Sequence, residues 1–198
     1  DPHVTKSTSR MVDENIHPVV PMRNAVGPMD YTPGVINTFQ PEYYLFTHYN
    51  GGGIGTRAYQ MALFVLFETG LQMLVDNPTM YYREEDCARF MASIPLPTDE
   101  TVSLAAKVGE YAIVAKRKGD KWYIGGMTNN KEKERVFELP FNFLPEGSTW
   151  KMVSYEDGVN ANKQAMHYMK REQEVKKGQT IRVKMARNGG FAAVLSVK

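Results

Sequence analysis

Cysteine is nearly absent from this sequence, in which Cys87 is the single one among 198 residues. One cysteine has no partner within the chain, so an internal disulfide is excluded and the fold depends on burial and hydrogen bonding. An excess of one charge sign is lacking too, because 24 Lys and Arg stand against 22 Asp and Glu, for a formal charge of +2. This balance argues against nucleic-acid binding, which needs a strongly basic surface.

Long apolar runs are also lacking. No stretch approaches the ~18 consecutive apolar residues of a membrane-spanning helix, and residues 1–10 lack the apolar core of a signal peptide. We therefore expect no transmembrane segment. Metal chelation by His and Cys has little support, because the four histidines are scattered. With 42% hydrophobic and 23% charged residues, the composition is that of an ordinary folded domain.

A change of pattern near residue 97 divides the chain. Helical patterns and loops rich in glycine or proline precede it, and short strands with closely spaced turn signals follow it. The segment Ile94–Pro97 marks the change, because each proline disfavours helical geometry in the residue before it. We predict two domains, at residues 1–97 and 98–198.

The first part contains two expected helices. Arg57–Val75 is apolar on nearly every side and follows Thr56, a candidate N-cap. A helix of this kind is buried on nearly every face, which is typical of the packed outer ring of a large α/β domain. A second, shorter helix is expected at Tyr82–Ala92.

The second part predicts an antiparallel sheet. The turn Lys118–Lys121 joins two strands into a hairpin, and further turns are expected at Glu156-Asp157-Gly158, Lys177-Gly178 and Gly189-Gly190. Seven short strands in about a hundred residues favour a two-sheet sandwich. The expected strands are Glu110–Arg117, Trp122–Met127, Arg135–Leu139, Thr149–Glu156, Gln164–Lys170, Thr180–Met185 and Phe191–Val197.

Two further features suggest ligand binding. The loop Gly51–Thr56 precedes a helix, as phosphate-binding loops do, but it lacks the Walker ending and the dinucleotide fingerprint, so a flexible entry into the helix is favoured. Five aromatic residues of the sheet part could stack on sugar rings, although strand alternation should turn about half of them into the core. They are Trp122, Tyr123, Trp150, Tyr155 and Tyr168.

The stretch Val12–Gly34 gathers the densest set of ionisable residues. It places Asp13, Glu14, Arg23 and Asp30 around two apolar segments and four prolines. Ionisable side chains in a rigid, loop-rich frame are typical of the catalytic mouth of an α/β barrel. An ordered structural loop in which Arg23 pairs with Asp30 is the competing interpretation.

Several motifs together carry a family resemblance. They are Pro21-Met22-Arg23, Gly27–Gly34 (GPMDYTPG), Gly55-Thr56-Arg57, Asp99–Thr101, Gly109–Tyr111, Ala115–Gly125 and Gly189–Ala193. In this combination the chain resembles glycoside hydrolase family 97, calcium-dependent exo-acting α-glycosidases found mainly in gut Bacteroidetes. The better-known members are α-glucosidases and α-galactosidases.

The resemblance implies an α/β plus all-β fold: the C-terminal part of a (β/α)8 barrel followed by a small antiparallel β-sandwich domain. A whole barrel needs about 200–250 residues, whereas fewer than a hundred precede the change at residue 97. The chain also begins Asp1-Pro2-His3, without an initiator methionine. We therefore expect a fragment of a longer hydrolase, inactive by itself.

The resemblance also implies site residues. Glu14 lies nine residues before Arg23, as the general acid of the family does, and in the family this glutamate also lies at the calcium. A second acidic calcium ligand is expected where this sequence has Thr8, which leaves the metal site incomplete. Arg23 and Asp30 are expected to shape the substrate site. A periplasmic location and an oligosaccharide or small glycoside substrate are implied as well.

Glycosidic cleavage requires two carboxyl groups, one to protonate the leaving oxygen and one to activate water or to attack the anomeric carbon. The second carboxylate is expected upstream of this chain. An exo-acting α-glycoside hydrolase is the leading hypothesis, and the alternative is a non-catalytic sheet module that braces the barrel or binds carbohydrate. If the truncated barrel stands alone, its apolar helix should drive self-association.

Overall fold

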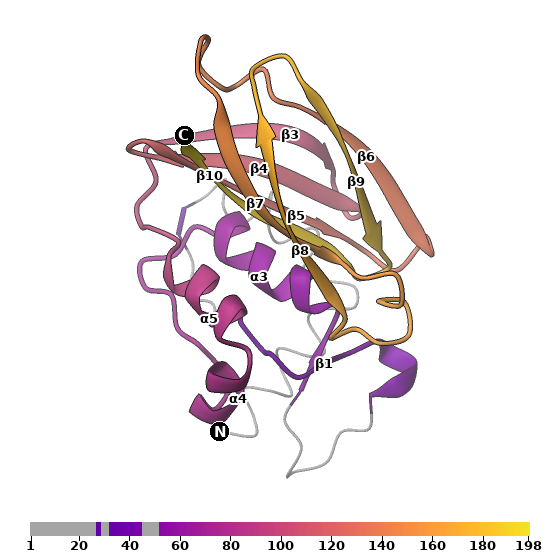
Figure 1. Ribbon diagram of the computed structural model, residues 1–198. Coiled ribbons are helices and arrows are strands. Elements are labelled where there is room, and N and C mark those ends of the chain that lie inside the picture. Colours follow the sequence, from indigo (N-terminus) through magenta and orange to yellow (C-terminus); the bar gives the residue numbers. More distant parts are fainter. Residues whose placement is uncertain (1–26, 29–31, 45–51) are drawn as a thin grey trace.

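The computed structural model describes residues 27–28, 32–44 and 52–198 (Figure 1). Helices cover one face of a large antiparallel sheet, and a two-stranded sheet covers the other face (Figure 1). The antiparallel-sheet part of the expected fold is thus confirmed. The described residues before position 97 form no closed barrel. No helix in these ranges is long and apolar enough to cross a membrane.

Eight strands follow residue 99. Six of them form the central sheet in the order β3-β4-β5-β10-β7-β8, and β6 pairs with β9 in the small sheet. All of these neighbours run antiparallel. Their bounds are β3 Glu100–Lys107, β4 Tyr111–Lys118, β5 Lys121–Thr128, β6 Glu134–Pro140, β7 Trp150–Asp157, β8 Tyr168–Val175, β9 Thr180–Ala186 and β10 Gly190–Val197.

The central sheet separates two hydrophobic cores, because successive side chains of a strand point to opposite faces. On β5, Trp122 belongs to the core shared with the small sheet, and Tyr123 belongs to the core shared with the helices. On β10, Phe191 and Ala192 are divided in the same way. The middle strands are therefore buried on both sides, and this explains their nearly continuous apolar sequence.

Two strands differ from the expectation. β3 is not among the expected strands, because much of it is exposed and a bulge between Ser103 and Ala105 interrupts its alternation. The strand expected at Gln164–Lys170 instead begins at Tyr168. Residues 158–167 form consecutive turns, closed by bonds such as Ala161 N to Gly158 O at 2.9 Å, and β8 is a charged edge strand without an apolar period.

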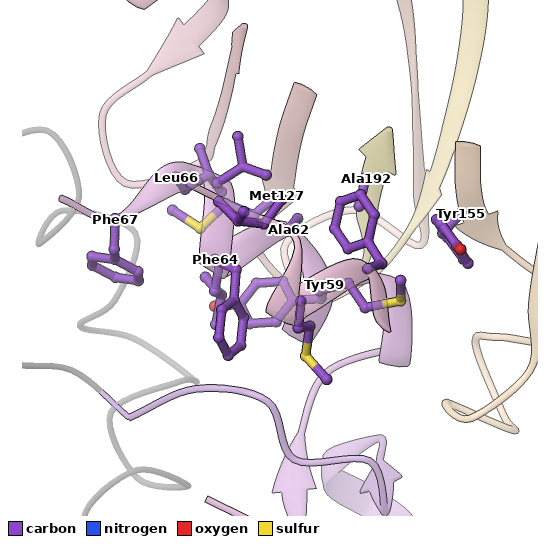
Figure 2. Close-up of a cluster of buried hydrophobic side chains, with 14 of the residues drawn as sticks. Tyr59, Ala62, Phe64, Leu66, Phe67, Met127, Tyr155 and Ala192 are labelled. Atoms are coloured by element: carbon purple, nitrogen blue, oxygen red, sulfur yellow. The ribbon is translucent and has the colours of Figure 1, made fainter. Parts of the chain in front are cut away.

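The helix α3 (Arg57–Leu66) confirms the expected burial. All ten of its residues are buried, and its N-cap is Thr56, whose hydroxyl accepts a hydrogen bond from the Tyr59 amide at 3.1 Å. The helix lies on strands β5 and β10 of the central sheet (Figure 2). Its other side packs against α5 (Glu85–Ala92), where Cys87 and Phe90 join the same core.

The expected continuation of this helix to Val75 is wrong. At Phe67 the backbone turns extended, and two carbonyls of the last turn accept hydrogen bonds from side chains. The Gln72 amide donates to Phe64 O at 2.6 Å, and the Lys116 ammonium to Leu66 O at 3.4 Å. Beyond this point Leu71 is 64% exposed, so an apolar run alone did not define the buried helix.

The second expected helix, Tyr82–Ala92, is divided into α4 (Pro78–Arg83) and α5. The Asn77 side chain caps α4 by accepting a bond from the Met80 amide at 3.1 Å. Between the two helices Glu84 leaves helical geometry, and its carboxylate lies 3.0 Å from the buried Arg57 guanidinium. The break thus places a carboxylate against α3.

A short parallel pair precedes α3. β1 (Thr38–Phe39) and β2 (Gly53–Ile54) run parallel with Thr38 opposite Gly53, and β1 is followed by the 3-10 turn η1 (Pro41–Tyr43). The chain enters α3 directly after β2. This strand-then-helix order is the local pattern of an α/β unit.

Glycines in the sheet allow α3 to lie unusually close. A Cβ atom at Gly125 of β5 would stand 2.7 Å from the Ala62 carbonyl oxygen and from the Val65 Cβ. At Gly190 of β10 it would collide with the backbone of Tyr59. Because these two positions carry no side chain, the backbone of α3 lies directly against the sheet. The side chains of α3 belong to the hydrophobic core shown in Figure 2.

Candidate functional site

The residues predicted for catalysis lie outside the described ranges. Glu14, Arg23 and Asp30 all fall in the segments 1–26 and 29–31. Their roles, including the tentative calcium ligation by Glu14, stay predictions. Within residues 27–28, 32–44 and 52–198, no three His, Cys, Asp or Glu side chains gather as a metal site would require.

The aromatic residues proposed for sugar stacking are mostly buried. Trp122, Trp150, Tyr123 and Tyr155 are each 5% exposed or less. Of the five, only Tyr168 is partly accessible, and its ring faces the Arg57 guanidinium at 5.6 Å. This set of residues therefore does not form a flat face of exposed rings for carbohydrate. Strand alternation places the rings on both faces of the central sheet, and both faces are covered.

In the described part of the glycine-rich loop, the amides next to α3 are not free to bind a phosphate. The amide of Gly55 donates to Phe39 O at 3.0 Å, that of Thr56 to Asn188 O at 2.9 Å, and that of Arg57 to Ala165 O at 2.9 Å. The donors that a phosphate cradle would use are thus bonded within the protein. Two of the three acceptors belong to the sheet part of the chain.

These bonds are part of a larger polar contact, which we name the strand-end seam. It joins residues 38–44 and 52–57, at the ends of β1 and β2, to the loop 158–167 and the turn 186–190 of the sheet part. Gln40 is its centre: it is fully buried, and its amide donates to Ala161 O at 3.0 Å and to Arg187 O at 2.9 Å. A glutamine just past a strand is thereby bonded to two distant loops.

Asp157 holds the 186–190 turn, whose carbonyls accept the hydrogen bonds from the Gln40 side chain and the Thr56 amide. One of its carboxylate oxygens accepts from the Ala186 amide at 2.8 Å and from the Gly190 amide at 3.0 Å, one at each end of the turn. Burial raises the pKa of Asp157 to about 7, against the lowering effect of the Thr56 hydroxyl and of the two amides. The carboxyl therefore titrates close to neutral pH.

The turn itself has a demanding backbone. Asn188 adopts a left-handed φ of 47°, which asparagine tolerates better than most residues. A Cβ at Gly189 would collide with the Asp157 carboxylate. The carbonyls of the turn can therefore point toward the seam only if residue 188 tolerates a left-handed φ and residue 189 has no side chain.

Charged pairs close the outer side of the seam. The Arg187 guanidinium holds both oxygens of Glu42, at 2.5 and 2.6 Å, and lowers the pKa of that carboxyl. On the inner side, Arg57 donates to Ile36 O at 3.2 Å and pairs with Glu84. The bidentate pair of Arg187 and Glu42 adds geometric specificity as well as attraction.

A pocket of about 340 Å³ lies beside the seam. Asp157 lines it together with charged side chains of both signs, among them Glu156, Arg171, Arg182 and Lys184. Glu156 already accepts from the Ser154 hydroxyl at 2.8 Å, and Asp157 holds the turn. This pocket therefore lacks a pair of free carboxylates of the kind that glycosidic cleavage requires.

Sequence reasoning identifies only part of the seam. It predicts Thr56 as a helix cap, and this prediction is confirmed. It predicts a turn at Gly189-Gly190, whereas the turn residues are Arg187 and Asn188 and Gly190 already begins β10. It also predicts a turn at Asp157, which instead ends the strand β7, and it assigns no role to Gln40. A buried glutamine next to a two-residue strand leaves no periodic signal, so only the fold could have revealed it.

The fold and the seam define a class: an antiparallel sheet domain packed against a short segment of helices and a two-stranded parallel pair. The family described as "Glycosyl-hydrolase 97 C-terminal, oligomerisation" matches residues 97–196. The chain belongs to glycoside hydrolase family 97, in its C-terminal part.

Relatives and solved structures agree with this assignment. A retaining alpha-galactosidase of Bacteroides thetaiotaomicron is 37% identical over 171 residues, which are 86% of this chain and 25% of that protein. A probable retaining alpha-galactosidase of Streptomyces bingchenggensis is 30% identical over 172 residues, covering 87% and 24%. A family 97 enzyme of Pseudoalteromonas sp. strain K8, solved with acarbose, has a TM-score of 0.80 at 26% identity, covering 92% and 28%. The chain thus spans about a quarter of the length of these proteins.

Proposed function

We propose that this chain is part of a retaining exo-acting α-glycoside hydrolase that releases terminal α-galactose. The observation that carries this proposal is the 37% identity to a retaining alpha-galactosidase over 171 residues. The structural neighbour that binds acarbose is 26% identical, so α-glucosides are the second substrate class to test.

In this proposal Glu14 is the general acid and base. It protonates the leaving oxygen and then, in a retaining reaction, activates the water that releases the sugar. The nucleophilic carboxylate, expected about 5–5.5 Å away, belongs to the part of the hydrolase that this chain does not span. Arg23 and Asp30 shape the substrate site without taking part in proton transfer.

The parallel pair β1/β2 with α3 is, in the same proposal, the end of the (β/α)8 barrel. Parallel pairing of the two strands and the direct entry from β2 into a fully buried helix support it. In such barrels the active site is built by the loops that follow the carboxyl ends of the strands. The ends of β1 and β2 therefore face the catalytic side.

The decisive experiment compares the complete hydrolase with its Glu14→Gln variant. We expect the wild type to cleave nitrophenyl α-galactoside faster than nitrophenyl α-glucoside, with α-galactose as the first product by NMR. Glu14→Gln should lose about 10²–10⁴-fold on a disaccharide with a poor leaving group and far less on the nitrophenyl substrate. The neighbouring Asp13→Asn is the matched control and should retain activity on both.

Equal loss on both substrates would assign Glu14 a structural or metal-binding role instead. If β-galactose were the first product, the retaining part of the proposal would be wrong.

Calcium dependence and a periplasmic location rest on the family resemblance alone. We propose that Glu14 takes part in calcium binding in the complete hydrolase, where further oxygen ligands are available. Calorimetric titration of calcium into the metal-free enzyme tests this, and Glu14→Gln should weaken binding at least tenfold. Fractionation of the native cells tests the location.

For the sheet domain itself we propose a bracing and assembling role. The family description names oligomerisation. Burial of the aromatic set weighs against carbohydrate binding through those rings. Before the sheet domain, Leu71, Met73, Leu74 and Tyr82 are large apolar side chains exposed after α3 and on α4, and they are candidates for contacts of this preceding segment with the rest of the barrel or a second copy. Sedimentation of the complete hydrolase should show a dimer or larger assembly, and a monomer at all concentrations would contradict this role.

A further inference from the structure

The strand-end seam contacts the chain at the ends of β1 and β2, where a role in bracing alone would not require a contact. β1 and β2 are only two residues long, so their own ladder fixes little of the chain that follows them. The position of Gln40 depends on Ala161 O and Arg187 O, which lie 121 and 147 residues further along the chain. Long-range bonds thus substitute for the short ladder.

These bonds form one continuous path. The Asp157 carboxylate holds both ends of the 186–190 turn, and the turn offers Arg187 O to the Gln40 amide and Asn188 O to the Thr56 amide. The Gly55 amide then bonds to Phe39 O at 3.0 Å and so couples the two strand ends to each other. A shift of the turn would therefore move both strand ends together.

The path is well protected from water. Gln40, Thr56 and Asn188 are each 1% exposed or less, and Asp157 is 8% exposed. Buried donors and acceptors that lose a partner are costly, so the arrangement has few alternatives of similar energy. A network of this kind sets a position more sharply than apolar packing, which tolerates small displacements.

We infer that the sheet domain, through this path, positions the described residues that follow β1 and β2, Gln40–Tyr44 and Gly55–Arg57, on the substrate side of the barrel, with Gln40 and Asp157 as positioning residues. The inference rests on the proposed function, because the strand ends face the substrate only if β1 and β2 belong to the catalytic barrel. Displacement of such residues by about 1 Å is enough to lower catalysis about 10²-fold. The effect should therefore appear in turnover even where the protein remains folded.

The test uses four variants of the complete hydrolase. Gln40→Met keeps the length of the side chain but removes both donors, and Asp157→Leu removes the acceptor of the turn. Asp157→Asn is the conservative variant, since its carbonyl can still accept from the Ala186 and Gly190 amides. Val183→Ala removes buried volume from the other core and controls for a general loss of stability.

We expect Gln40→Met and Asp157→Leu to lower kcat/KM on the nitrophenyl glycoside by about 10- to 100-fold at a temperature where all variants are folded. Asp157→Asn and Val183→Ala should stay within about twofold of the wild type. Hydrogen exchange should show faster exchange of the Gly55, Thr56 and Arg57 amides in the first two variants only. Gln40→Met lies outside the sheet domain, so it decides the question if Asp157→Leu does not fold.

The inference is overturned if Val183→Ala lowers kcat/KM as much as Gln40→Met does, because stability alone would then explain the loss. It is overturned as well if exchange at these three amides is unchanged in Gln40→Met. An inactive wild-type hydrolase would count against the proposed function, whereas the exchange experiment would still decide whether the path positions the strand ends.

Discussion

At the scale of single residues, the seam depends on a carboxyl group whose surroundings change its chemistry. Asp157 is buried at the end of β7, and burial raises its pKa to about 7 from the ordinary value of 3.8. In the unfolded chain the same carboxyl titrates near its ordinary value. Between these two values the folded protein binds the proton and the unfolded chain does not.

The contribution of Asp157 to the free energy of unfolding should therefore fall as pH rises from about 4 to about 7, since its carboxyl is protonated in the folded state and ionised in the unfolded state over this interval. Asp157→Asn removes the titration but keeps an acceptor for the Ala186 and Gly190 amides. We expect the stability difference, wild type minus Asp157→Asn, to decrease from pH 5 to pH 8 in urea unfolding experiments. Parallel stability curves for the two proteins would contradict this prediction.

Thr56 and Asp157 illustrate how far single residues can be interpreted from sequence. The prediction of Thr56 as the cap of α3 is confirmed, because capping depends on residues three apart in the chain. For Asp157 the sequence predicts a turn, since Asp before Gly is typical of turns. Its actual role depends on the amides of Ala186 and Gly190, about thirty residues away, which local sequence does not reveal.

At the scale of elements, the packing of α3 on the sheet is the contact that joins the two parts of the chain. Gly125 lies beneath it, and a side chain there would meet the backbone of Ala62 and the side chain of Val65. We expect Gly125→Ala to lower the free energy of unfolding by about 1–3 kcal/mol, because the helix would have to move away from β5.

Gly70 supplies the matched control for this substitution. A Cβ atom there would have no heavy atom within 4 Å, so Gly70→Ala should change stability little. Chemical denaturation of both variants measures the difference, and equal stability would contradict the close approach of α3 to the sheet.

The end of α3 offers a second prediction. Lys116 of β4 is 3% exposed, and its ammonium pairs with Glu68 at 2.5 Å and reaches Leu66 O at 3.4 Å. Burial lowers the pKa of Lys116, and the Glu68 carboxylate opposes this change. Removing only the carboxylate leaves a buried cation without its partner, whereas replacing the lysine removes the buried charge itself.

We therefore expect Glu68→Gln to be more destabilising than Lys116→Met, by about 1 kcal/mol or more in thermal or urea unfolding. The double variant should resemble Lys116→Met. If Lys116→Met proved the more damaging change, the lysine would contribute through its packing and its bond to Leu66 O more than through the charge pair.

The elements after residue 110 were largely predictable, and those between 57 and 92 less so. Hairpin turns and alternating apolar residues are local signals, so strands such as β4 and β5 are predicted close to their actual bounds. The end of α3 depends on the side chains of Gln72 and Lys116, which donate hydrogen bonds to two of its last carbonyls. Lys116 belongs to the central sheet. An apolar run of 57–75 contains no mark of that contact.

At the scale of the whole molecule, the predicted division at residue 97 stays a prediction, and the family match begins at the same residue. The core that contains α3 also contains Tyr123, Met127, Tyr155 and Ala192 of the sheet. Residues 98–198 alone would expose that face to water. An apolar patch of this kind on a monomer favours association or loss of stability.

We therefore expect residues 98–198 to self-associate or to unfold at lower denaturant concentration than the full 198 residues. Sedimentation velocity and urea unfolding of the two chains measure this. A monomeric fragment of equal stability would show that the sheet domain does not need α3. In the 198-residue chain α3 is already buried, so self-association would have to use other residues. The family description, which names oligomerisation, is compatible with such self-association.

The sequence alone was enough to assign the family, the antiparallel sheet, the capped and buried helix and the absence of an internal disulfide, because these depend on motifs, periodicity and composition. Tertiary structure decided where α3 ends, which aromatic residues are buried and how Gln40, Thr56 and Asp157 meet in one seam. The physical reason is distance along the chain: local patterns record what neighbouring residues do, whereas the Gln40 amide at the centre of the seam bonds to carbonyls more than a hundred residues away, which only folding brings within 3 Å.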